Sequence, residues 1–152
     1  MKKYAILFAL TVLLISCGSK KEVPSNKVNA ENKNVAQILK DSNTFLITEI
    51  STDKTYGLTP ENAVEVGGSK EKEGPRNERR YLNALTGPNG EAISYFRAGS
   101  CCPVESKNGL MGYAMLDNYR VTWENAKDTV SIYINMYDSG KLKAPVGFTI
   151  AK

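Results

Sequence analysis

The sequence predicts an α+β domain, in which one helix packs against a small antiparallel sheet. Two segments, residues 119–124 and 130–137, alternate apolar and polar side chains with the period of two that is typical of strands. Another segment, residues 75–85, spaces its apolar side chains as a helix does. Several strands with one helix favour the α+β class, and 152 residues leave room for one such domain.

The first elements of the predicted domain are short. Residues 35–40 are expected to form a helical turn, residues 44–50 a strand and residues 63–66 a second, shorter strand. Residues that favour turns separate these elements, namely Gly57, Pro60, Gly67 and Gly68.

The helix is expected over residues 75–85. Pro75 suits the first helical position, because the nitrogen there needs no hydrogen-bond partner. Tyr81, Leu82 and Leu85 form one apolar stripe, and Gly87 favours the end of the helix. The Gly-Pro-Asn-Gly run at residues 87–90 predicts a tight turn.

The C-terminal half is expected to supply the sheet. Residues 92–98 have the composition of a strand, and residues 125–128 are short enough to close a hairpin between the two alternating segments. In the last strand one side should face the core, and its side chains are Val130, Ile132, Ile134 and Met136.

Composition excludes several classes of function. Hydrophobic residues make up 41% and charged residues 24% of the chain, as in an ordinary globular protein. The net charge of +4 is too weak to indicate a nucleic-acid surface. The chain has no histidine, which excludes Ser–His and Cys–His catalysis and histidine metal sites, and no cofactor is predicted.

The N-terminus has the pattern of an export signal. Lys2 and Lys3 precede an apolar run over residues 4–15, which is too short to span a membrane as a helix. Residues 14–17, Leu-Ile-Ser-Cys, resemble the lipobox of bacterial lipoproteins, in which the cysteine is lipidated. Residues 1–16 are therefore expected to be a signal peptide and Cys17 the lipidation site. The alternative is an ordinary secretory signal in which Cys17 is incidental.

The segment after the lipobox is expected to be a polar tether, over residues 17–34, to a folded domain at residues 35–152. Gly18, in place of an aspartate, resembles the signal for sorting to the outer membrane. Acyl chains on Cys17 would anchor the protein there, facing the periplasm, without a spanning helix.

Cys101 and Cys102 are adjacent in the sequence. Because Cys17 is consumed by lipid, these two can form a disulfide within the chain only with each other. The alternatives are a structural turn with the two cysteines joined or buried, a thiol-redox site, a soft-metal site that includes nearby methionines, and a disulfide that contacts a ligand.

Two polar clusters are candidate ligand sites. Arg76, Arg79 and Arg80 place three guanidinium groups on the predicted helix, where they could bind a phosphate or carboxylate or form a solvated face with local ion pairs. Tyr133 and Tyr137 lie on the polar side of the last strand, as a glycan or peptide platform or as ordinary half-exposed tyrosines.

Several short motifs stand out together between residues 52 and 150. They are Thr55-Tyr56-Gly57-Leu58-Thr59, Val66-Gly67-Gly68, Gly74-Pro75, Asn77-Glu78-Arg79, Tyr81-Leu82-Asn83-Ala84-Leu85, Gly87-Pro88-Asn89-Gly90, Gly99-Ser100-Cys101-Cys102-Pro103 and Asn135-Met136-Tyr137-Asp138. As a set they resemble a family of small Gram-negative envelope lipoproteins with no established activity. The resemblance therefore implies an envelope location and assigns no catalytic residues.

Some relatives in that family are called 2-dehydro-3-deoxyphosphooctonate aldolase. That enzyme is similar to other TIM barrels, which need about 250 residues, and it acts on a cytoplasmic metabolite. The sequence instead favours a non-enzymatic envelope module that binds a partner protein, a glycan or a small ligand. The alternative is an enzyme, or a thiol-redox or soft-metal protein, centred on Cys101 and Cys102.

Overall fold

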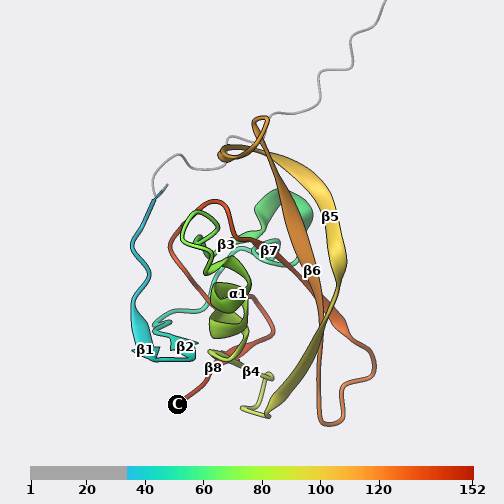
Figure 1. Ribbon diagram of the computed structural model, residues 1–152. Coiled ribbons are helices and arrows are strands. Elements are labelled where there is room, and N and C mark those ends of the chain that lie inside the picture. Colours follow the sequence, from blue (N-terminus) through green and yellow to red (C-terminus); the bar gives the residue numbers. More distant parts are fainter. Residues whose placement is uncertain (1–33) are drawn as a thin grey trace, which may run out of the picture.

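The computed structural model describes residues 34–152 (Figure 1). The predicted signal peptide, Cys17 and the tether up to residue 33 lie outside these residues. The elements in chain order are β1 (Leu39–Asp41), β2 (Thr44–Phe45), the 3-10 turn η2 (Pro60–Asn62), β3 (Val64–Glu65), α1 (Gly74–Leu82), β4 (Leu85–Thr86), β5 (Ile93–Leu110), β6 (Tyr113–Trp123), β7 (Val130–Asn135) and β8 (Thr149–Ile150).

The main sheet has the strand order β3-β7-β6-β5. Its three long strands pair in antiparallel fashion, which agrees with the predicted α+β class. The expectation of a purely antiparallel sheet is wrong, because β3 lies parallel to β7, with Val64 opposite Ile134. This pairing satisfies backbone groups on the outer side of β7 and buries both side chains completely.

Strand β5 is far longer than residues 92–98. It forms with β6 a hairpin that reaches well beyond the helix (Figure 1). Three irregularities interrupt its register, between Arg97 and Gly99, between Cys101 and Pro103, and between Glu105 and Leu110. Each bulge shifts the alternation of side chains, so the period of two that marks a regular strand is lost beyond residue 98.

Helix α1 begins one residue before the predicted start and ends at Leu82, three residues before the predicted end. The chain leaves the helix early because Leu85 and Thr86 pair with β8. Gly74 at the helix start lies against Met136, and a Cβ atom there would meet the Met136 sulfur at 2.6 Å. This close contact fixes the N-terminal end of α1 beside the chain that leaves β7.

The first segment of the domain differs from the expectation. Residues 35–40 do not form a helical turn, because residues 39–41 are β1, which pairs with β2 around a turn closed by the Asp41 side chain. The expected strand at residues 44–50 is regular only over β2, and Ile50 forms an isolated bridge with Ala144.

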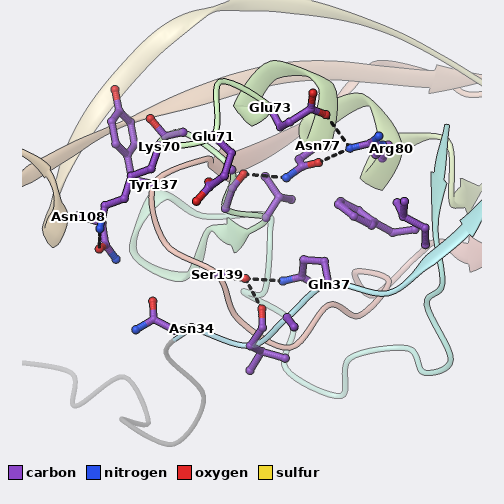
Figure 2. Close-up of a pocket in the computed structure, with 18 residues that line it drawn as sticks. Asn34, Gln37, Lys70, Glu71, Glu73, Asn77, Arg80, Asn108, Tyr137 and Ser139 are labelled. Atoms are coloured by element: carbon purple, nitrogen blue, oxygen red, sulfur yellow. Dashed lines mark hydrogen bonds and ion pairs between the residues drawn. The ribbon is translucent and has the colours of Figure 1, made fainter. Parts of the chain in front are cut away.

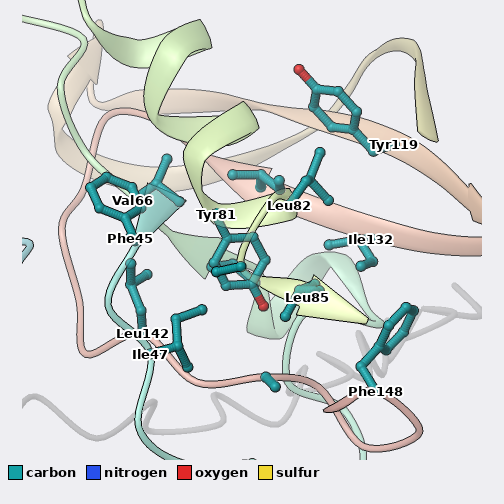
Figure 3. Close-up of a cluster of buried hydrophobic side chains, with 14 of the residues drawn as sticks. Phe45, Ile47, Val66, Tyr81, Leu82, Leu85, Tyr119, Ile132, Leu142 and Phe148 are labelled. Atoms are coloured by element: carbon teal, nitrogen blue, oxygen red, sulfur yellow. The ribbon is translucent and has the colours of Figure 1, made fainter. Parts of the chain in front are cut away.

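The core lies between α1 and the main sheet (Figure 3). Tyr81 and Leu82 of the helix and Ile132 and Ile134 of β7 have no exposed surface. The predicted inner face of the last strand is therefore confirmed for its two central residues. Within residues 34–152, the helices are all too short or too polar to cross a bilayer.

Candidate functional site

One cleft lies where the N-terminal segment meets the loop after β3, and we call it the loop cleft. It has a volume of about 480 Å³. Figure 2 shows hydrogen bonds between polar side chains within each side of the cleft. The Gln37 amide donates to Ser139 at 2.8 Å, and Arg80 contacts both Glu73 and Asn77. These polar groups of the loop cleft therefore already have partners within the domain.

A second cleft, of about 460 Å³, lies between α1 and the β5–β6 pair, and we call it the carboxyl cleft. Its lining combines aromatic rings with charged groups, and consists of Pro75, Arg79, Tyr95, Phe96, Arg97, Asp117, Tyr119 and Met136. The Tyr95 and Tyr119 rings meet edge to face at 6.0 Å, so they form one continuous aromatic wall.

The strands and the helix bring the charged groups of this cleft together. Asp117 and Tyr119 are two residues apart on β6, so both side chains point to the face that α1 covers. Glu78 is on α1, where its buried side chain contacts both Tyr119 and Asp117 without lining the cleft itself. Arg97 comes from β5, where it is paired in register with Tyr119.

Asp117 is buried, with only 3% of its surface exposed, and three hydrogen bonds hold its carboxylate. Arg97 binds it with two nitrogens, Nε to Oδ2 at 2.6 Å and Nη2 to Oδ1 at 2.7 Å. The Ser100 hydroxyl donates to Oδ1 at 2.8 Å. A bidentate guanidinium compensates the charge of a buried carboxylate.

Glu78 has no exposed surface and lacks such a cation. Its Oε2 accepts a hydrogen bond from the Tyr119 hydroxyl at 2.8 Å, whereas Oε1 has no donor among the described residues. Burial, and then the charge of Asp117, raise the pKa of Glu78 to about 7, against the opposing effects of the Tyr119 hydrogen bond and Arg97. Asp117 offers only acceptor oxygens, so the two carboxyl groups bind each other when Glu78 holds a proton.

No family model, curated protein or solved structure matches this chain. The function is therefore argued from the geometry of the site. Glu78 does not line the carboxyl cleft, but a carboxyl group that gains or loses its proton near neutral pH changes the charge beside Asp117 and Tyr119, which do line it. Within residues 34–152, no three Cys, Asp or Glu side chains are arranged to hold a metal ion.

The three arginines predicted as a ligand site do lie together. Arg76, Arg79 and Arg80 line one depression of about 180 Å³, which adjoins the carboxyl cleft along Arg79 and Tyr95. Arg76 and Arg80 are both ion-paired with Glu73. The Arg79 side chain has no ion pair or hydrogen bond within residues 34–152, and its charge acts on the hydroxyls of Tyr95 and Tyr119. Of the three, Arg79 is the one available to a ligand.

The two tyrosines predicted as a platform are not brought to one site. Tyr137 lines the loop cleft, and Tyr133 is half-buried on β7 and lines neither cleft nor the arginine depression. Cys101 and Cys102 are joined as a disulfide, with their Cα atoms 3.7 Å apart. They are half-buried in the edge strand β5, directly after Ser100. Their sulfurs are not thiolates in this state, and thiolates are what a soft metal requires.

Sequence reasoning missed Glu78 and Asp117. Glu78 precedes Tyr81 by three residues and Leu82 by four, so it occupies the apolar stripe of the helix. Asp117 precedes Tyr119 and Val121 by two and four residues, on the inward face of its strand. An acidic residue at a core-facing position of each element was the signal that could have found the pair.

Proposed function

We propose that this protein is a lipid-anchored module of the bacterial envelope that binds a small anionic ligand in the carboxyl cleft. The observation that carries the proposal is the unpaired Arg79 side chain at the mouth of this cleft, next to the Tyr95 and Tyr119 rings. Anchoring through Cys17, outer-membrane sorting and a periplasmic orientation rest on the lipobox and Gly18 in the sequence.

The charges of the cleft define the class of ligand. Asp117 compensates Arg97, and Glu78 holds its proton when the pH is below its pKa of about 7. Arg79 then contributes the uncompensated positive charge, which favours a carboxylate or phosphate group. Tyr95 and Tyr119 provide aromatic rings beside it. The ligand therefore combines one anionic group with a ring, as an acidic sugar or an aromatic acid does.

Binding is tested by calorimetry with phenyl phosphate, benzoate and glucuronate. We expect at least one of them to bind, and Arg79→Gln to weaken its binding about tenfold or more through loss of one charge-assisted contact. Arg76→Gln removes an equal charge one turn away, from a side chain paired with Glu73, and should change binding little. If none of the three compounds binds, or if the two variants lose equal affinity, the ligand proposal fails.

The anchor is tested on the protein made in a Gram-negative host. Mass spectrometry of the mature N-terminal peptide should show acyl chains on Cys17, and membranes should retain the protein. Cys17→Ser should release most of the protein into the soluble fraction. An N-terminus without acyl mass would disprove lipidation and would leave the ligand site untouched.

Glycoside hydrolysis, a common task of carboxyl pairs, is not supported. Glycosidases hold their two carboxyl groups roughly 5 to 9.5 Å apart so that the sugar bond or a water fits between them. Glu78 and Asp117 are instead close enough to hydrogen-bond directly. The pair is suited to sharing a proton beside a bound ligand.

A further inference from the structure

The β5–β6 hairpin ends in an exposed apolar surface, which we call the hairpin tip. It consists of Leu110, Met111, Gly112 and Tyr113, with Met115 just below. Leu110 is 79% exposed and Met111 is 90% exposed, the highest exposures of large hydrophobic side chains in the described chain. Tyr113 is 53% and Met115 43% exposed. Such a cluster on a projecting element marks an interaction surface rather than part of a core.

The turn itself directs these side chains outward. Leu110 pairs with Tyr113, so Met111 and Gly112 form a two-residue loop, and both have positive φ angles, 54° and 86°. Such loops favour Asn, Asp or Gly at both positions. The turn does not explain Met111 at the first position, because a positive φ angle disfavours a large side chain there. Packing does not explain Met111 either, because its side chain is 90% exposed.

The point where the chain enters the domain indicates what covers the tip. Asn34, the first described residue, and Asn108, near the end of β5, line the same loop cleft, and Figure 2 shows both at its edge. The segment that leads from Cys17 therefore reaches the domain at the end that carries the hairpin tip. Lipid on Cys17 would therefore attach to the domain from this end, and insertion of the hairpin tip would then set which end faces the membrane.

The chemistry around the tip fits a bilayer surface. Lys70 binds Asn108 through its Nζ at 2.8 Å, and Lys107 is exposed on β5. The amphipathic ring of Tyr113 suits the headgroup level, beside the apolar side chains of the tip. The acidic groups nearby are Glu105 on β5, Glu71 beside Lys70, and Asp138, which accepts hydrogen bonds from Ser106 and Asn108. These carboxylates balance the lysines, so the exposed apolar side chains and not net charge carry the fit to a bilayer.

We propose that the hairpin tip inserts into the surface of the bilayer that carries the Cys17 lipid, and so sets the orientation of the domain on the membrane. This inference rests on the anchoring part of the proposed function and does not depend on the ligand in the carboxyl cleft. The hairpin tip is covered by lipid in this proposal. The experiment distinguishes lipid from a protein partner that covers the same surface.

The first test places a fluorescent reporter at the tip of the lipidated, full-length protein in phosphatidylethanolamine–phosphatidylglycerol vesicles. Met111→Trp should show blue-shifted emission and quenching by brominated lipid. Lys127→Trp is the matched control, because it lies in the loop at the other end of β6. It should remain as exposed as in buffer. The native Trp123, which packs against Phe148, contributes the same background fluorescence in both variants.

The second test separates the tip from the anchor. The mature chain with Cys17→Ser should still float weakly with the same vesicles, and Leu110→Ser with Met111→Ser should reduce its partitioning about tenfold or more, given the apolar surface removed. Ile38→Ser with Leu46→Ser removes two exposed apolar side chains elsewhere and should change flotation little.

Three results would overturn the inference. The first is a tip reporter that stays exposed to water in vesicles while the lipidated protein still sediments with them, since the anchor would then hold without tip insertion. The second is a blue shift only when envelope extract is added, which would assign the tip to a protein partner. The third is equal flotation of the two double variants.

Discussion

The hydroxyl of Tyr119 on β6 donates a 2.8 Å hydrogen bond to the carboxyl group of Glu78 on α1, across 41 residues of sequence. Both residues are buried, and the bond crosses the interface between the helix and the sheet. The other oxygen of the Glu78 carboxyl, Oε1, has no donor among the described residues. The stability of this interface should therefore depend on the proton that Glu78 carries.

Glu78→Gln should change how stability depends on pH. The Glu78 carboxyl ionises near its ordinary value of 4.5 in the unfolded chain, and its pKa is about 7 in the folded protein. The folded state therefore binds this proton more tightly than the unfolded chain does. The proton stabilises the fold fully below about pH 4.5, and this stabilisation is lost as the pH rises through about 7. The loss is on the order of 3 kcal/mol.

Urea unfolding at pH 5 and pH 8 measures this effect. From pH 5 to pH 8 the wild type should lose stability as Glu78 ionises. Glu78→Gln should not lose this contribution, because glutamine has no proton to lose. Glu61→Gln, at an exposed position, should follow the wild type at both values. If the two variants show the same pH dependence, Glu78 does not titrate as described.

Tyr119→Phe should destabilise the protein by about 1–2 kcal/mol, because both oxygens of a buried carboxyl then lack a donor. The Tyr119 hydrogen bond lowers the pKa of Glu78, so its removal should raise that pKa above about 7. Carbon NMR of the Glu78 carboxyl reads the pKa directly. An unchanged titration would mean that the hydroxyl does not contact the carboxylate form.

Arg97→Met should cost about 2–3 kcal/mol of stability, because it leaves the buried Asp117 charge without its guanidinium. Adding Asp117→Asn should recover part of this loss, since the amide needs no compensating cation. A double-mutant cycle from denaturant unfolding gives the coupling energy. Strictly additive effects would contradict the bidentate contact.

The Cys101–Cys102 disulfide should be fully formed in the purified protein. Alkylation under denaturing conditions should add no label before reduction and one label on each of these cysteines after it. Replacing both with serine should cost only about 1 kcal/mol, because a ring that spans two adjacent residues constrains the unfolded chain little.

The same double variant separates the two functional hypotheses. Probe binding in the carboxyl cleft should persist without the disulfide, because neither cysteine lines that cleft. A thiol-redox protein would instead lose its activity with the cysteines. Loss of probe binding in a variant that still folds would therefore favour the site centred on Cys101 and Cys102.

Local patterns predicted those elements whose side chains alternate regularly. Val130–Asn135 was recognisable because its inner face is apolar, and Pro75 marked the start of the helix to within one residue. The patterns were wrong where pairing with a distant segment overrides local preference. Leu39 and Asp41 pair with β2, and the bulges of β5 hide an 18-residue strand behind irregular spacing.

The sequence by itself determined the α+β class, the inward face of β7 and the expectation of a lipid anchor at Cys17, since each depends on residues close together in the chain. Only the tertiary structure decided that Glu78, Asp117 and Arg97 meet. Periodicity shows which side of an element is buried but not which element covers it. The partners of a buried carboxyl come from that packing, and they decide whether its proton is held near neutral pH.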